Sequence, residues 1–436
     1  MNKTAAAGKD WQPARESNIE AFVSYFESGV KRNDAPGELG IELEHIIVHS
    51  DLSPVSYSGD HGVEWILRKL ATDYHHSTYD AAGDLLGVSR PNEAVTLEPA
   101  AQLELSAGPY ESLEEASAAF SSFERTLADI LSPAGERVAP VGYHPTATAM
   151  SLELIPKRRY EFMDRYLGSK GKFGPCMMRG SASTQVSIDY FSRDDCLRKL
   201  RLAFALVPLL ALMCDNSPVF EGRPRTHRLV RTKVWQHCDP DRCGVVPGIM
   251  EGSFTLRRYA EYLLDTPAIL IPGSKGQWDY SERTFGDIYA NQPMTRADVE
   301  HAVSMFFNDV RLKTYIEIRP ADAMPIPYVI AYAALIKGLF YDQNNLDALD
   351  RLFAGVDAAQ VEHAKEGLMA DGYRATPYNR PAAELCDRLV ELAYGGLKPR
   401  ERHFLDPLAE LVRRRTTLAD EAVVECGMNG DLGGQE

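Results

Sequence analysis

The sequence predicts an α+β fold with one antiparallel β-sheet and helices packed on its outer face. Short stretches alternate apolar and polar residues, as strands with one buried face do. Longer stretches with apolar residues at helical spacing separate them. The order is not the regular strand–helix alternation of a parallel sheet, and no glycine-rich turn joins a strand to a helix. A single antiparallel sheet accounts for all three observations.

The elements follow one another irregularly along the chain. Residues 38–50, ELGIELEHIIVHS, combine alternation with β-branched residues and predict a strand. Residues 95–108, VTLEPAAQLELSAG, predict two short strands that turn at Pro99–Ala100. Further strands are predicted at 136–144, 181–190 and 312–320, the last ending at a proline, and helices at 17–31, 62–71, 111–131 and 194–214.

The C-terminal part of the chain, from Pro327 onwards, is predicted to be mostly helical. No convincing linker divides the chain. We therefore predict a single functional unit over residues 1–436, with its core in 38–345 and a helical C-terminal portion in 346–436.

The composition fits a soluble globular protein. A formal net charge of −15 argues against nucleic-acid binding, which needs clustered cations. The longest apolar run, residues 202–214, contains Pro208 and is shorter than the ~18–20 residues that span a bilayer, so we expect no membrane segment. Residues 1–18 lack a signal-peptide core and the seven cysteines lack paired spacing, so we expect a cytoplasmic protein. An acidic surface without coiled-coil heptads predicts a monomer or weak homodimer.

Carboxylates and amides recur on the polar faces of four predicted strands. Side chains two residues apart on a strand project from the same face, so each strand carries them opposite its buried Ile, Val or Leu residues. Taken singly, each is more typical of a solvated sheet residue. Repeated in four strands, the arrangement favours a shared site. The residues are Glu42, Glu44, Glu98, Glu104, Gln185 and Glu317.

Converging carboxylates need a counter-charge. Two of them about 5 Å apart repel by roughly 3 kcal/mol at an effective dielectric constant of ~20. Several such pairs would approach the ~5–15 kcal/mol that stabilises a whole domain. Either they are spread over a solvated face or a divalent cation neutralises them. Glu and Gln oxygens without His or Cys suit Mg²⁺, with Mn²⁺ as an alternative, and such sites often also bind nucleotide phosphates.

A basic segment at residues 221–235 could complete the site. It concentrates arginines, including Arg225 and Arg231, in an otherwise acidic chain. Planar guanidinium groups bind carboxylates and phosphates through two parallel hydrogen bonds, so we take both arginines as candidate substrate contacts. A basic loop that pairs with surface acids is an open alternative.

A second basic segment, residues 155–163, carries Lys157 and Arg159. These two residues could contact nucleotide phosphates, although a solvated loop is the favoured alternative. Arg319, two residues after Glu317, could stabilise charge on a transferring phosphoryl group, or form a salt bridge at a strand end.

Six segments resemble, in order and spacing, the plant-type glutamate–cysteine ligases, the GCS2 group of the carboxylate–amine ligases. They are GIELEH, VTLEPAAQLELSAG, IPKRRYEFM, MMRGSASTQVSIDY, CDNSPVFEGRPRTHRLVRTKVWQHCDPDRCG and VRLKTYIEIRPADAMP, all within the predicted ligase core 38–345. The resemblance implies a curved antiparallel sheet, like that of glutamine synthetase, which cradles Mg²⁺, ATP as co-substrate, and glutamate. Gly180 to Ala182 and Pro320 depart from the family pattern, and the first of these departures bears on the acceptor.

The resemblance also implies roles for the candidate residues. Arg319 looks like the arginine that steadies the transferred phosphoryl group, with Glu317 as its catalytic neighbour. Arg231 looks like the anchor of the glutamate carboxylate, and Trp235 like a wall of its pocket. The metal shell would be Glu42, Glu44, Glu98, Glu104, Gln185 and Glu317.

These implications lead to one functional hypothesis with open alternatives. The hypothesis is ATP-dependent joining of the glutamate γ-carboxylate to the amine of cysteine through a γ-glutamyl phosphate, so that the partners are small molecules. The same chemistry with another amine, or a non-catalytic glutamate- or nucleotide-binding relative, are the alternatives. A hydrolase with two metal ions would leave the arginine-rich segment unexplained.

Overall fold

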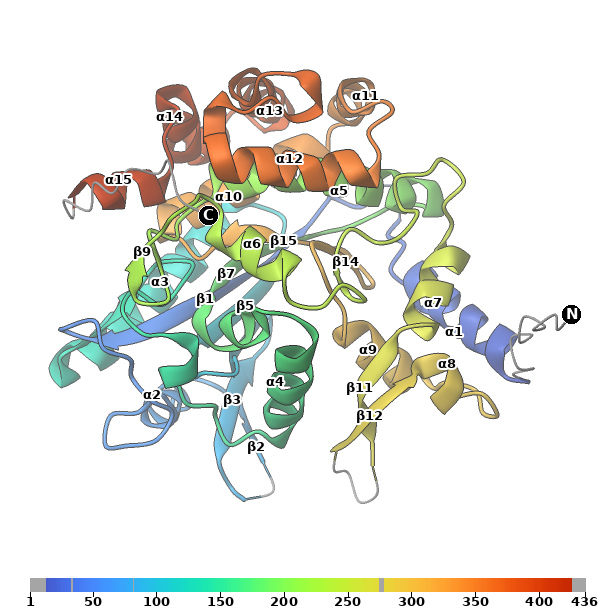
Figure 1. The fold of residues 1–436 in the computed structure, drawn as a ribbon. Helices are drawn as coiled ribbons and strands as arrows, with labels where there is room; N and C mark the ends of the chain where they lie inside the picture. The colour runs from blue at the N-terminus through green and yellow to red at the C-terminus, as the bar shows by residue number, and fades with distance from the viewer. Residues whose placement is uncertain (1–12, 33, 81, 274–277, 426–436) are drawn as a thin grey trace, which may run out of the picture.

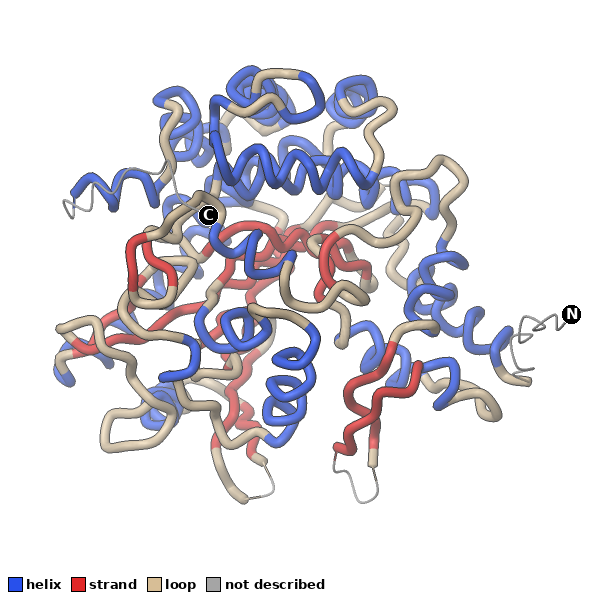
Figure 2. Tube along the Cα trace, in the orientation of Figure 1, coloured by secondary structure: helices blue, strands red, loops and turns tan. Residues whose placement is uncertain are grey.

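A nine-stranded antiparallel sheet forms the centre of the computed structural model, which describes residues 13–32, 34–80, 82–273 and 278–425. The strand order is β14-β15-β7-β1-β5-β4-β3-β2, with β6 paired to β1 (Figure 2). The strands are β1 (Leu39–His49), β2 (His76–Tyr79), β3 (Leu85–Arg90), β4 (Glu93–Leu97), β5 (Leu103–Tyr110), β6 (Glu136–Ala139), β7 (Ser183–Ile188), β14 (Val310–Leu312) and β15 (Ile316–Asp322).

The α+β prediction with one antiparallel sheet is confirmed. Every predicted strand has a counterpart in this sheet, and the two strands predicted within 95–108 are part of the β4–β5 hairpin. Strands β2 and β3 are not predicted. Strand β2 exposes all four of its residues and therefore has no apolar alternation to detect.

The prediction of one strand over 312–320 that stops at a proline is wrong. A hairpin interrupts it after Leu312, and β15 continues through Pro320 to Asp322. The register against β7 shifts by one residue between Ile318 and Ala321. Pro320 lies in this bulge, where its missing N–H breaks no ladder hydrogen bond.

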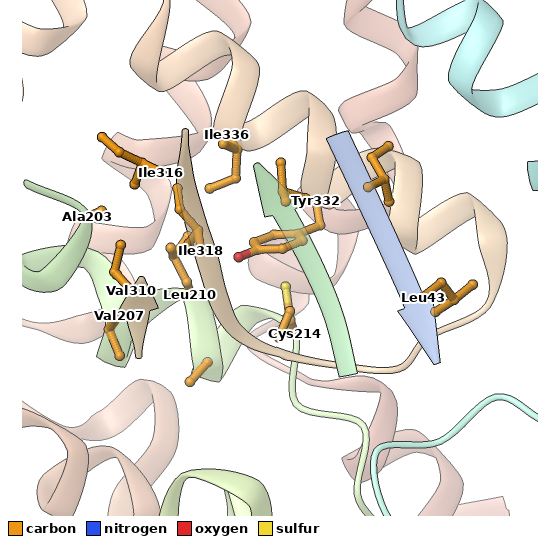
Figure 3. Packing of buried hydrophobic residues seen from close by; sticks show 14 of the residues in the cluster. Leu43, Ala203, Val207, Leu210, Cys214, Val310, Ile316, Ile318, Tyr332 and Ile336 are labelled. Carbon is orange, nitrogen blue, oxygen red and sulfur yellow. The ribbon is translucent and has the colours of Figure 1, made fainter. Parts of the chain in front are cut away.

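Three helices cover the apolar face of the sheet: α3 (Leu113–Leu131), α5 (Arg193–Met213) and α10 (Ile326–Phe340). Figure 3 shows Tyr332 of α10 and Leu210 of α5 near Ile318 of β15. These side chains are at most 1% exposed. Each fully buried large apolar side chain stabilises the fold by roughly 1.5–3 kcal/mol, so this face is fixed and the opposite face is left for polar groups.

The helices of the C-terminal part stack over α5 and α10, on the side away from the polar face (Figure 1). They are α11 (Gln343–Leu352), α12 (Ala358–Asp371), α13 (Ala382–Gly396) and α14 (Asp406–Arg414). Helix α15 (Leu418–Glu425) lies to one side of this stack, where the Ala419 N–H donates to the Asp215 carbonyl just after α5 (Figure 1). Within the residues that the structure describes, no helix is both long enough and apolar enough to cross a membrane.

The remaining elements lie around the polar face and the edge of the sheet (Figure 1). Helix α4 (Arg158–Lys170), the π-helical turn η3 (Cys176–Gly180) and α6 (Val230–Gln236) contribute residues to the polar side. The other helices are α1 (Arg15–Glu27), α2 (Val63–Leu70), α7 (Leu256–Leu264), α8 (Phe285–Ile288) and α9 (Arg296–Ser304); the other strands are β8 (Val219–Phe220), β9 (Arg223–Pro224), β10 (Cys243–Gly244), β11 (Pro267–Pro272), β12 (Trp278–Thr284) and β13 (Phe307–Asn308).

Candidate active site

The register of the central strands brings the predicted carboxylates onto one face of the sheet. Glu44 of β1 stands opposite Glu104 of β5. Glu42 of β1 stands opposite Gln185 of β7, and Glu317 lies one strand further out, on β15. Side chains in directly opposite positions have Cβ atoms about 5 Å apart, so these groups are close neighbours.

A cavity of about 260 Å³ opens on this face. Its lining holds four carboxylates and five basic side chains, so opposite charges nearly balance. Apolar side chains from α4, η3 and α6 complete its wall. The charged and amide residues of the lining are Glu42, Glu44, Glu98, Glu104, Gln102, Gln185, Arg159, Arg231, Arg311, Lys313 and Arg319.

The carboxylates in this cavity raise one another's pKa. Burial raises the pKa of Glu104 to about 8, and the charges of Glu98 and Glu44 add to it. Burial also raises the pKa of Glu42 and of Glu98 to about 7, assisted by Glu317 and Glu44 respectively. Because each carboxylate perturbs another, the group shares one electrostatic environment. A bound cation would offset their mutual repulsion.

Glu317 lies behind the cavity wall and holds three cations in place. Its Oε2 accepts hydrogen bonds from Arg311 Nε at 2.7 Å and from Arg319 Nη1 at 2.8 Å, and its Oε1 accepts one from Lys313 Nζ at 2.8 Å. Its side chain is 0% exposed. Burial would raise the pKa of Glu317, but the three cations outweigh it and hold the pKa well below its usual range. The role of Glu317 as a metal ligand stays a prediction.

Gln185 connects the carboxylates to Arg319. Its Oε1 accepts a hydrogen bond from Arg319 Nη1, and its Nε2 lies 3.4 Å from Glu44 Oε1. Glu44 is also fixed by Ser183, whose backbone N–H and hydroxyl donate to it at 2.7 and 2.8 Å. These contacts orient both residues toward the cavity, and their metal binding stays a prediction.

Arg231 and Trp235 reach the cavity from α6, one turn apart on the same helix face. The side chain of Arg231 is 5% exposed, and Trp235 lies with its ring centre 5.9 Å from the Arg319 guanidinium carbon. The residue before the helix, Leu229, has φ 54°, a left-handed conformation that is strained for leucine and turns the chain into α6. The structure thus brings both predicted residues to the site.

The segment 155–163 is not a solvated loop, because it begins helix α4. Arg159 lines the cavity, and its Nε is buried without a hydrogen-bond partner among the described residues. Lys157 lies at the N-cap, with its Nζ 4.6 Å from the centre of the Tyr160 ring. Burial lowers the pKa of Lys157, while the nearby charge of Glu98 opposes this change. Both cations therefore stand near the carboxylates, and ATP contact stays a prediction for them.

Arg225, predicted to bind substrate, is placed elsewhere. Its guanidinium is buried between Asp215 and Asp420, with hydrogen bonds of 2.5 Å to each. Asp420 belongs to α15, so this ion pair fixes the C-terminal helix to the core. Arg225 is not among the residues that line the cavity, and substrate binding stays a prediction for it.

The sequence-based predictions missed two cations of the cavity: Arg311 lies just before the strand predicted at 312–320, and Lys313 lies within it but was not taken as a candidate. The signal was present: polar or aromatic residues occupy every second position from Arg311 to Arg319. Three methionines in the wall were also missed. Met163, Met177 and Met178 come from α4 and η3, which carry no strand-like pattern.

The donor set of the cavity fits a hard divalent cation. Carboxylate and amide oxygens, without histidine or cysteine, are the ligands that Mg²⁺ prefers. Within the described ranges, no group of three or more His, Cys, Asp or Glu side chains stands ready to hold a metal ion. The convergence of the carboxylates in one cavity is observed, and metal binding stays a prediction.

A second, larger cavity of about 590 Å³ adjoins the first along the same sheet face. Glu42 lines both cavities and stands between them. Lys31, Arg90 and Arg296 line the larger cavity, each in an ion pair with a nearby acid, and Tyr315 supplies an aromatic ring; the lining also holds Glu38, Glu93 and Asp189. Together the two cavities give room for two different small molecules that meet near Glu42.

Fold and cavities together define an α+β protein with an open antiparallel sheet whose charged face suits small anionic substrates. Residues 38–422 match the family described as Glutamate-cysteine ligase family 2 (GCS2). The chain therefore belongs to this family, and the resemblance noted from the six segments is confirmed.

Two plant glutamate–cysteine ligases are similar to this chain in sequence, and one solved structure is similar to it in fold. The chloroplastic glutamate–cysteine ligase of Medicago truncatula is 28% identical over 410 residues, covering 92% of this chain and 80% of the relative. The chloroplastic enzyme of Arabidopsis thaliana is 28% identical over 413 residues, covering 92% and 78%. A crystal structure of glutamate–cysteine ligase from Francisella tularensis in complex with AMP has a TM-score of 0.58 at 12% identity, covering 92% of this chain and 86% of that chain. This last likeness shows the fold alone.

Proposed function

We propose that this protein joins the γ-carboxylate of glutamate to the amine of cysteine with consumption of ATP. The observation that carries the proposal is the lining of the smaller cavity, in which four carboxylates face five cations on one sheet face. Phosphoryl transfer between two anions requires positioning and charge neutralisation, and this lining supplies groups for both. The plant relatives named above bear the name of this activity.

Glutamate would enter the smaller cavity with one carboxylate on Arg231. The guanidinium is fixed on one side by the backbone of β15, where its Nη1 donates to Ala321 O at 2.9 Å. Trp235 lies one turn further along α6 and would exclude water from the substrate. The γ-carboxylate would then point along the sheet toward Glu42.

ATP would occupy the larger cavity, with its terminal phosphate at the junction near Glu42. Arg311, Lys313 and Arg319 belong to the β14–β15 hairpin, which lines the smaller cavity, and Glu317 holds all three. An oxygen of the γ-carboxylate attacks the terminal phosphorus, ADP leaves, and the amine of the acceptor displaces phosphate from the γ-glutamyl phosphate. The three cations stabilise the charge on the transferred group.

The carboxylates Glu42, Glu44, Glu98 and Glu104, with Gln185, would hold Mg²⁺. When bound, the ion neutralises phosphate charge and fixes its geometry. With the ion bound, the carboxylates would repel one another less and stay ionised, and the hydrogen bonds from Ser183 would hold Glu44 in place.

The acceptor would lie against the methionine wall. Met163, Met177 and Met178 present polarisable sulfur and no charge to this part of the cavity. A small uncharged side chain such as the thiol of cysteine fits this wall better than a charged one. This surface supports cysteine over amines with a charged side chain.

An activity panel tests the proposal. Purified protein is incubated with ATP, Mg²⁺, glutamate and one amine at a time, while ADP is followed and the product is identified by mass. ADP with cysteine and a product of the mass of γ-glutamylcysteine are expected. ADP with a different amine would change the acceptor, and no ADP with any amine would refute the ligase proposal.

We propose a monomer or weak homodimer in the cytoplasm. The oligomeric part of this proposal is supported by the acidic net charge of −15, which disfavours self-association. Sedimentation at several protein concentrations measures the first part, and a tight dimer at low concentration would contradict it.

A further inference from the structure

Arg231 lines the smaller cavity, and the backbone of β15 occupies one side of its guanidinium. Its Nη1 donates to Ala321 O at 2.9 Å and lies 3.5 Å from Asp322 Oδ1. Its Nε is buried and has no hydrogen-bond partner in the part of the chain that the structure describes. The Nε–Nη2 edge carries two parallel N–H groups, the geometry that grips a carboxylate. A group that holds Nη1 in place therefore also sets the orientation of the Nε–Nη2 edge.

Asp322 is itself held firmly. Its Oδ2 accepts hydrogen bonds from the Asn216 backbone N–H at 2.8 Å and from Ser217 Oγ at 2.7 Å. A Cβ on Gly142 would stand 2.3 Å from the Asp322 carboxyl carbon, so the backbone of residue 142 closes the remaining side. The carboxylate cannot rotate away from Arg231 without losing these two donors.

The bulge at Pro320 explains why Asp322 faces Arg231. Before the bulge, Ile318 pairs with Val186 and lies on the apolar face. After it, Asp322 pairs with Ser183, which lies on the polar face and bonds to a cavity carboxylate. The extra residue changes which face the even-numbered positions occupy.

We propose that Asp322 is a positioning residue, which fixes Arg231 so that its Nε–Nη2 edge receives the α-carboxylate of the amino-acid substrate. The inference rests on the proposed function and extends it, because Asp322 itself touches neither the substrate nor the cavity. It also predicts selectivity: ligands without an α-carboxylate gain nothing from Asp322.

The test compares two competitive ligands in the wild type and in Asp322→Asn. Glutarate keeps both carboxylates of glutamate, whereas 4-aminobutyrate lacks the α-carboxylate. We expect the variant to raise the KM of glutamate and the inhibition constant of glutarate by roughly 10-fold, the effect of one charge-assisted hydrogen bond. The inhibition constant of 4-aminobutyrate and the KM of ATP should change less than about twofold. Asp322→Glu should restore part of the loss.

Asp215→Asn is the matched control, since Asp215 is also a buried aspartate paired with an arginine. It should lower the midpoint of thermal unfolding without changing the ratio of the two inhibition constants. If Asp322→Asn weakens both ligands equally, it acts through general distortion and the inference is overturned.

The experiments distinguish a failure of the proposed function from a failure of the role inferred for Asp322. A wild-type protein that forms no ADP and shows no calorimetric binding of glutamate or glutarate would overturn the proposed function and this inference with it. Wild-type turnover with an unchanged glutamate KM in Asp322→Asn would overturn this inference alone.

Discussion

Replacing Glu104 by glutamine removes one charge from the cavity while keeping its shape. Thr96 Oγ1 donates to Glu104 Oε1 at 2.9 Å, and the amide oxygen of glutamine can accept the same hydrogen bond. The substitution therefore tests the repulsion among the carboxylates with little change in packing.

The expected size of the effect follows from the pKa. Burial and the neighbouring charges of Glu98 and Glu44 raise the pKa of Glu104 from 4.5 to about 8. A raised carboxyl pKa destabilises the folded protein once the unfolded chain ionises, so the penalty is absent below pH ~4.5 and grows up to pH ~8. At pH ~7 it amounts to roughly 3 kcal/mol, an upper value because the neighbours titrate together.

Urea unfolding with and without Mg²⁺ measures this effect. Without metal, Glu104→Gln should be more stable than the wild type at pH ~8 and equal to it at pH ~4.5. Added Mg²⁺ should stabilise the wild type strongly at pH ~8 and the variant less, because a ligand charge is gone. A variant that is less stable than the wild type at both pH values, or equally stabilised by Mg²⁺, would refute the reasoning.

Three further substitutions probe other parts of the site. Glu317→Gln should lower kcat by at least about 100-fold, measured as ADP release with circular dichroism as the fold control; unchanged turnover would remove Glu317 from the machinery. Arg225→Met leaves the charge of Asp215 buried and unpaired and should destabilise the fold by roughly 3–5 kcal/mol in urea unfolding, and a loss of glutamate affinity at unchanged stability would restore Arg225 to substrate binding. Gly180→Ala would place a Cβ 2.4 Å from the Tyr143 ring and should lower the thermal midpoint; an unchanged midpoint would show that the ring moves aside.

The polar face of the sheet could be predicted because alternation is a local signal. Glu42 and Glu44 are two residues apart, so their common face follows from strand geometry alone. Gln185 and Glu104 could be added because their own strands alternate in the same way. This prediction did not require knowing which strands pair, because any sheet with its apolar faces turned to the core leaves the carboxylates on the same opposite face.

The rest depended on contacts that the local sequence does not contain. Arg225 lies in the same basic segment as Arg231, but its partner Asp420 is 195 residues away, so only the fold shows that the two arginines lie in different places. Arg159 lies in the first turn of α4, whose apolar stripe is short, and its burial comes from neighbours on other elements. The methionine wall has no sequence pattern that distinguishes it from core.

The slip at Pro320 makes the number of residues in β15 as important as their identity. Inserting one residue between Ala321 and Asp322 would move Asp322 out of its pairing with Ser183 and send its carboxylate toward the helices behind the sheet, with every other side chain chemically unchanged. In a sequence alignment, a one-residue insertion placed between Ala321 and Asp322 therefore predicts that the Asp322 carboxylate lies on the opposite face of the sheet. Chimaeric proteins joined within this strand should keep its number of residues, even where they change the residue identities.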